Sequence, residues 1–141
     1  MFGSRALGGA QRMLLAAGVA VALAGAAGCG SSSKPAYCSD VKDFKSAVGD
    51  LGNVSVTNVS AVKAAIDKVE STGTAAVNSA KSAFPNQTTA LKSSLGAIGA
   101  TATQLTDPST RKAALKQLPA EIGGVGSAAK SFEDATSSKC S

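Results

Sequence analysis

The feature that most constrains the fold of this chain is a spacing of apolar residues by threes and fours. It recurs in four successive segments. Because an α-helix turns once in about 3.6 residues, each segment is expected to form a helix with one apolar stripe. The stripes are Val41, Phe44, Val48 and Leu51; Val59, Val62, Ile66, Val69, Gly73, Ala76, Ala80 and Phe84; Leu91, Leu95, Ile98, Ala102 and Leu105; and Leu115, Leu118, Ile122, Val125, Ala129 and Phe132.

The connections between these segments are short, and short connections make neighbouring helices antiparallel. We therefore expect an all-α fold, an antiparallel up-down four-helix bundle closed by one disulfide between its termini. The expected domain covers 38–141, with helices at about 39–51, 59–83, 86–106 and 108–136. Asp107 is expected to cap the fourth helix, with Pro108 at its first position. Pro119 and the glycines after it are expected to kink or interrupt that helix.

The first 28 residues have the composition of an export signal rather than of a folded domain. Arg5 and Arg12 precede an unbroken run of 15 small apolar residues at 13–27. That run is shorter than the 20 or so residues needed to span a membrane, and small residues follow it. This pattern is typical of a secretory signal peptide, expected at 1–28. A Ser- and Pro-containing stretch at 29–37 is expected to be a flexible tether.

The end of this signal, "AGAAGC", resembles the lipobox of bacterial lipoproteins. The resemblance implies that the signal is cut before Cys29 and that the Cys29 thiol carries a diacylglyceryl group. Ala26 stands where most lipoboxes have Leu, Val or Ile. The alternative is an ordinary secreted protein that is cut near Ala27 and keeps Cys29 as a free thiol.

If Cys29 carries lipid, Cys38 and Cys140 remain from the three cysteines of the chain. Exported compartments favour disulfides, so these two are expected to pair. The up-down order places the start of the first helix and the end of the fourth at the same end of the bundle. The two cysteines occupy those two places, which agrees with the expected bond.

The residue types present exclude most catalytic chemistry. The chain has no histidine, so Ser-His-Asp and Cys-His arrangements are absent, and no metal site or cofactor is expected. The carboxylates, including Glu70 and Glu121, mostly fall off the apolar stripes and are expected on solvated faces. After residue 28 there remain twelve basic and nine acidic side chains, an excess too small to indicate nucleic-acid binding. The sequence predicts a protein that is not an enzyme.

Arg111, Lys112 and Lys116 form a basic cluster at the expected start of the fourth helix. Positive charge beside free N–H groups favours an anion, so the cluster is a candidate site for an anion or a partner protein. An ordinary solvated basic face remains the alternative.

The expected first helix, at about 13 residues, is roughly half as long as the second at about 25. Residues of the first connection must therefore cover part of the core. A kink at Pro119 beside that connection would leave an apolar groove for a lipid or another small molecule, with Val54 and Val56 at its edge. The alternative, which we favour, is that these two valines fill the gap.

The layout as a whole is similar to the small, Ala- and Ser-rich secreted lipoproteins of actinobacteria. The matching residues are Cys29, the "YCSD" stretch at 37–40 and Cys140. The resemblance implies a non-enzymatic lipoprotein held on the outer face of the cell membrane by the lipid on Cys29. Its expected role is that of an interaction or accessory module for an envelope protein or an anionic cell-wall polymer. The alternative function is a carrier of an apolar or amphiphilic small molecule.

Overall fold

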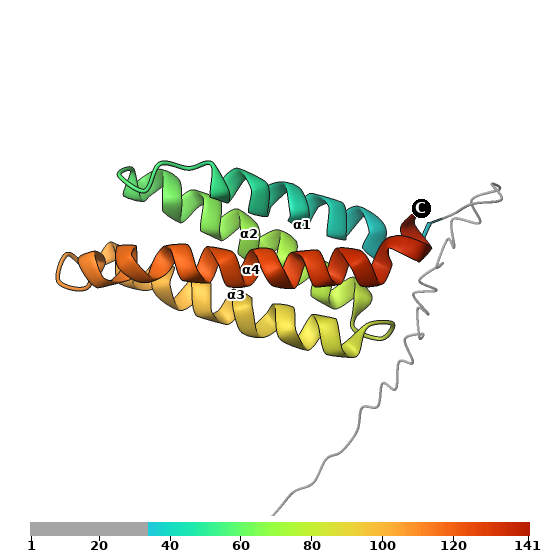
Figure 1. Ribbon diagram of the computed structural model, residues 1–141. Helices are drawn as coiled ribbons and strands as arrows, with labels where there is room; N and C mark the ends of the chain where they lie inside the picture. Colours follow the sequence, from blue (N-terminus) through green and yellow to red (C-terminus); the bar gives the residue numbers. More distant parts are fainter. Residues whose placement is uncertain (1–33) are drawn as a thin grey trace, which may run out of the picture. The chain divides into compact units, whose positions relative to one another are not determined.

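The computed structural model describes residues 34–141, which form an all-helical domain without strands (Figure 1). The helices are α1 (Tyr37–Gly52), α2 (Val59–Ala80), α3 (Pro85–Thr106) and α4 (Arg111–Cys140). The expected signal peptide and Cys29 lie outside the described residues.

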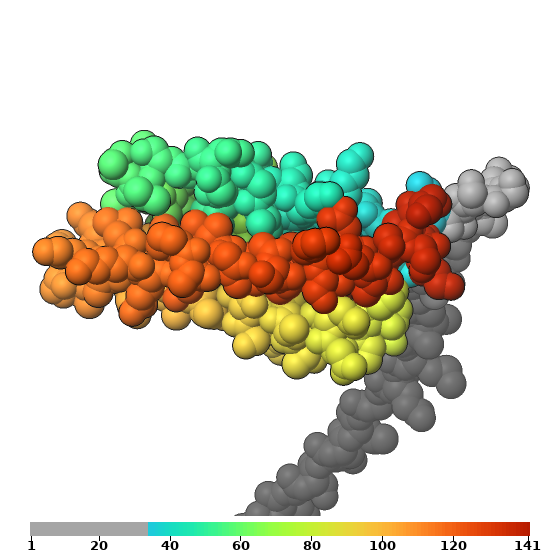
Figure 2. Space-filling model, viewed as in Figure 1, coloured from blue at the N-terminus to red at the C-terminus, as the bar shows by residue number. Residues whose placement is uncertain are grey.

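Each helix packs against the next along the chain, and α4 also packs against α1. In Figure 1 the α1–α2 and α3–α4 connections lie at one end of the domain. The α2–α3 connection and the C-terminus lie at the other. Figure 2 shows the face on which α1 lies beside part of the longer α4.

Most residues of the apolar stripes form the core, as the spacing predicted. Five stripe residues are only half-buried against it, and two alanines outside the stripes, Ala47 and Ala114, are buried. The half-buried ones are Val48, Val59, Phe84, Leu115 and Ile122. The side chains of Phe44, Leu51, Ile66, Leu118 and Phe132 are almost completely buried. Gly73 belongs to this core because α2 and α3 approach closely there. A Cβ at Gly73 would lie 2.7 and 2.8 Å from the two methyl carbons of Leu95.

Three threonines that the apolar pattern omits are also buried, Thr88, Thr101 and Thr136. The hydroxyls of Thr88 and Thr136 donate to the carbonyls of Phe84 and Phe132, four residues earlier, at 2.9 and 3.0 Å. A threonine that satisfies its hydroxyl on its own helix in this way presents mainly its methyl group to the core. For this reason a pattern search that counts only apolar residue types does not identify these threonines as core residues.

The expected disulfide is present: Cys38 at the start of α1 is bonded to Cys140 at the end of α4. An aromatic cluster lies within the domain beside these helix ends. The Tyr37 and Phe84 rings are 5.4 Å apart, and those of Phe84 and Phe132 are 6.3 Å apart, both edge to face. Residues from α1, the α2–α3 connection and α4 thus meet in one cluster.

The boundary between the third and fourth helices differs from the expectation. Asp107 follows the end of α3 and does not cap α4, which begins at Arg111 rather than at 108. The Asp107 carboxylate accepts from the backbone N–H of Ser109, two residues on, at 2.8 Å. This bond closes an Asx turn that contains Pro108, and the turn delays the start of the helix.

The start of α2 at Val59 and the end of α3 at Thr106 match the predicted bounds, and the remaining helix ends differ from them by one to four residues. Helix α1 begins at Tyr37 instead of 39, α2 ends at Ala80 instead of 83, and α3 begins with Pro85 at its first turn. Helix α4 extends to Cys140 instead of 136, so the disulfide is attached directly to a helix end.

The expected interruption at Pro119 is wrong, since α4 continues through this residue without a break. Proline removes the N–H that would bond the carbonyl of Leu115, four residues earlier. Pro119 is exposed, and so are Gly123 and Gly124. Packing of the opposite face of α4, through Leu118 and Val125, keeps the helix continuous.

Candidate functional site

Within the basic cluster, Arg111 has a structural role, whereas Lys112 and Lys116 are exposed. Arg111 is half-buried, and its Nε donates to the carbonyl of Leu105 at 2.9 Å. Thr110 Oγ1 donates to the carbonyl of Gln104 at 2.8 Å. Both bonds satisfy carbonyls in the last turn of α3, where positive charge is also favoured by the helix dipole. Arg111 therefore caps α3.

Lys112 and Lys116 are exposed and form no ion pair with any residue of 34–141. They lie four residues apart on α4, so they share one face of the helix. The structure thus leaves two of the three predicted basic residues available to a partner.

The turn before this face is held by Asp107. The Ser109 hydroxyl and backbone N–H both donate to Asp107 Oδ1, at 2.7 and 2.8 Å. The hydroxyl bond and then the backbone bond hold the pKa of Asp107 below its ordinary value of 3.8, and the Arg111 charge acts in the same direction. The ionised carboxylate is therefore the form that the turn stabilises.

We expect the Asp107 carboxyl to titrate with a midpoint below 3.8, measured by NMR of its side-chain carbon. Because the folded pKa is depressed, the stability that Asp107 contributes is present above its ordinary pKa and is lost as the pH falls through the folded pKa. Ser109→Ala should raise the midpoint towards 3.8, whereas Ser127→Ala on the exposed face of α4 should not change it. A midpoint unaffected by Ser109→Ala would contradict this account of the turn.

The residues of the predicted groove beside the first helix differ in their exposure to solvent. Val54 is half-buried and packs against the core, as the gap-filling alternative requires. Val56 is 48% exposed, and Pro119 is also exposed. None of the three lines either of the two grooves described next.

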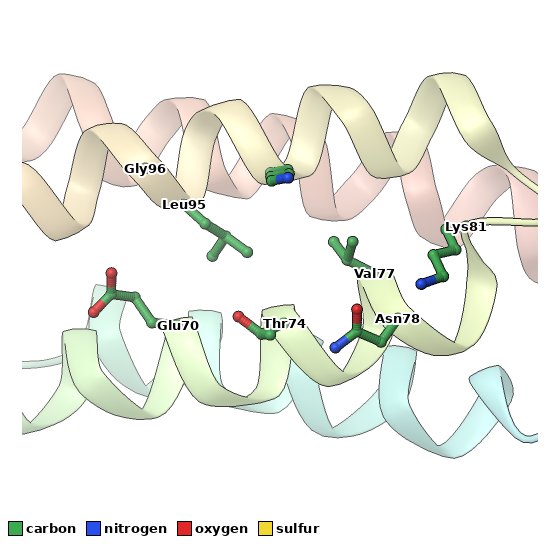
Figure 3. Close-up of a pocket in the computed structure, with 8 residues that line it drawn as sticks. Glu70, Thr74, Val77, Asn78, Lys81, Leu95 and Gly96 are labelled. Carbon is green, nitrogen blue, oxygen red and sulfur yellow. The ribbon is translucent and has the colours of Figure 1, made fainter.

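The larger groove, of about 550 Å³, lies between α2 and α3 (Figure 3). Val77 and Leu95 provide apolar surface, and Thr74 and Asn78 line the α2 side. Leu95 is 7% exposed, so little of it is open to solvent. Gly96 leaves the α3 side open, because a Cβ built there would meet no atom within 4 Å.

The groove has one acidic residue, Glu70, and two basic residues, Lys81 and Lys92, in its lining. In Figure 3 Glu70 and Lys81 lie at opposite ends of the α2 side. Lys92 also lines the groove. The Glu70 carboxylate lies against Gly99 of α3, where a Cβ would collide with Glu70 Oε1. Within residues 34–141, none of Glu70, Lys81 and Lys92 forms an ion pair.

A smaller groove of about 370 Å³ lies between α1 and α4. Gly49 and Gly126 leave space between the two helices, and Lys45 and Glu133 form an ion pair across the groove. Because its own opposite charges are paired, this groove presents less unsatisfied charge than the one between α2 and α3.

In the described part of the chain, no three His, Cys, Asp or Glu side chains are placed to share a metal ion. Among the helices of residues 34–141, none combines the length and apolarity needed to cross a membrane. Comparison of the chain with protein-family models, with curated protein sequences and with solved structures finds no match in any of the three.

Proposed function

We propose that this protein is a lipid-anchored, non-enzymatic module on the outer face of the cell membrane. The observation that carries the proposal is the disulfide between Cys38 and Cys140. Structural disulfides are typical of exported proteins, so the bond supports the extracytoplasmic location that the signal-like start of the chain indicates. With two cysteines paired, Cys29 is the one left for acylation, and the "AGAAGC" stretch gives it the right sequence context.

The proposed arrangement of the domain is an antiparallel up-down bundle. The alternation of the connections between the two ends in Figure 1 supports it, as does the packing of each helix on the next. In this arrangement the tether enters at the end that holds the disulfide. The α3–α4 connection, with Lys112 and Lys116 just after it, then lies at the end away from the membrane.

The partner in this proposal is an envelope protein or an anionic wall polymer that contacts Lys112 and Lys116. Both ammonium groups are exposed and unpaired within the described domain, so binding an anion requires no internal ion pair to break. Arg111 is not part of this surface in the proposal, because its side chain is bonded to the end of α3.

The proposal predicts that the protein, extracted from its own membrane, carries a mass increase from lipid on the fragment that begins at Cys29. Cys29→Ala should abolish that increase and release the protein from the membrane fraction, because a protein without its lipid keeps no anchor. Mass spectrometry and fractionation measure both results. An unmodified Cys29 in protein that stays with the membrane would contradict the proposal.

The same preparation tests the partner surface. Anchored protein with Lys112→Glu and Lys116→Glu should lose retention of a defined polyanion, polyglutamate, at physiological salt. Lys42→Glu together with Lys139→Glu is the matched control, since both lysines are exposed and unpaired within residues 34–141 and the two double variants change the net charge equally. Equal losses in both variants would assign the retention to net charge rather than to the surface on α4.

A further inference from the structure

We propose that the groove between α2 and α3 binds a short peptide with free termini. The peptide lies extended along the groove, with its ammonium group at Glu70 and its carboxylate at Lys81 and Lys92. This site lies on a different pair of helices from the groove expected beside the first helix. It goes beyond the lipoprotein role proposed above and does not depend on acylation of Cys29.

The spacing of the charges sets the length of the ligand. Glu70 on α2 and Lys81, the first residue after α2, are eleven residues apart, which is about 16 Å at the rise of an α-helix. On α3, Glu70 lies against Gly99. Lys92 is seven residues before Gly99, or about 10 Å along the axis of α3. An extended chain advances about 3.3–3.6 Å per residue, so roughly three to five residues span these distances.

The side chains between the charges fit a peptide. Thr74 and Asn78 lie one turn apart on α2, and in Figure 3 both side chains line the gap between the helices. Neither side chain makes a hydrogen bond within residues 34–141, whereas Thr72 and Ser79 of the same helix donate to carbonyls four residues earlier. A hydroxyl and an amide that are free in this way can pair with peptide N–H and C=O groups. Val77 and the small exposed part of Leu95 offer apolar contact to a ligand side chain.

The position of Glu70 favours a peptide over an anionic amphiphile. An amphiphile with its headgroup at the lysines would place its apolar tail against the Glu70 carboxylate. Covering a carboxylate with apolar surface is costly unless an opposite charge or a hydrogen-bond donor accompanies it. A peptide supplies an ammonium group at that end, so both ends of the ligand meet a charge of opposite sign.

The test uses the purified full chain and the tetrapeptide Ala-Leu-Leu-Ala, with binding measured by isothermal titration calorimetry. Free termini should give the tightest binding, and N-acetylation or C-amidation should each weaken it about threefold, as expected for partly exposed ion pairs. In Glu70→Gln, N-acetylation should no longer weaken binding. In the Lys81→Gln, Lys92→Gln double variant, C-amidation should no longer do so.

Steric blocking provides a second readout that does not alter charge. Gly96→Leu should reduce affinity more than tenfold, because its side chain extends into the groove without meeting an atom of the fold at its Cβ. Gly124→Leu is the matched control, since it also adds a leucine at an open helical glycine, but on α4. Circular dichroism should show both variants folded.

Three results would overturn the proposal. One is no detectable binding of the free peptide. Another is equal affinity for free and doubly blocked peptides. The third is dodecanoate binding that Gly96→Leu abolishes and Glu70→Gln leaves unchanged, which would assign the groove to an amphiphile instead.

Discussion

Replacing Cys38 and Cys140 with serine is expected to lower the free energy of unfolding by about 4–5 kcal/mol, since the bond closes a long loop in the unfolded chain. The two cysteines are separated by 102 residues in sequence, so the bond restricts almost the entire domain. The loss is large for a core rich in Ala and Val, which buries little area per residue. Urea unfolding of the variant and of the parent protein measures it.

Two controls isolate the effect of the bond. Reductant should destabilise the parent protein by the same amount and leave the double variant unchanged. Cys29→Ser removes the third cysteine of the chain without changing the bond, so its unfolding free energy should equal that of the parent. If the double variant lost less than 1 kcal/mol, or about a fifth of the expected value, the loop-closure account would be wrong.

Phe132→Ala is expected to cost about 3–5 kcal/mol, the usual range for removing a fully buried aromatic side chain. Phe132 is 0% exposed, and its ring packs edge to face against Phe84, which in turn contacts Tyr37. The substitution leaves a cavity where α4 meets the α2–α3 connection. Thermal and urea unfolding both report the loss.

Val56→Ala is the control for this substitution, because Val56 is 48% exposed and should cost less than about 0.5 kcal/mol. Phe132 and Cys140 lie eight residues apart on α4, about 12 Å along its axis, so their effects are expected to add. A loss at Phe132 no larger than that at Val56 would mean that the aromatic cluster does not hold this end of the domain.

The helices could be predicted from the sequence because their evidence is local. The spacing of Leu91, Leu95 and Ile98 is enough to predict one face of a helix, and each of these residues is buried as expected. The disulfide could also be predicted, since helix order and connection length place Cys38 and Cys140 together. The start of α4 was harder to predict, because Asp107 followed by Pro108 is compatible with a helix cap and with an Asx turn. The hydrogen bond to Ser109 decides between them.

The groove between α2 and α3 could not be predicted in the same way. In the sequence, Glu70, Lys81 and Lys92 are ordinary charges off the apolar stripes, for which a solvated face is the natural expectation. Glu70 is instead half-buried against Gly99, and Glu121 is half-buried with an oxygen that has no hydrogen-bond partner in the described domain. These placements depend on which helices become neighbours and on their relative rotation. The glycines at 96 and 99 are the one local indication of this groove in the sequence, since neither contributes a side chain to the surface of α3.

The bond between Cys38 and Cys140 also determines how the domain responds to mechanical load. Their Cα atoms are 5.5 Å apart, and every residue between them belongs to a closed covalent ring. Force applied between the residues before Cys38 and those after Cys140 crosses the disulfide from the start of α1 to the end of α4, without first peeling α1 away. Even complete loss of helical structure would add almost no length between Cys38 and Cys140. The domain therefore resists extension along this one line of pull by a covalent bond rather than by its helix packing.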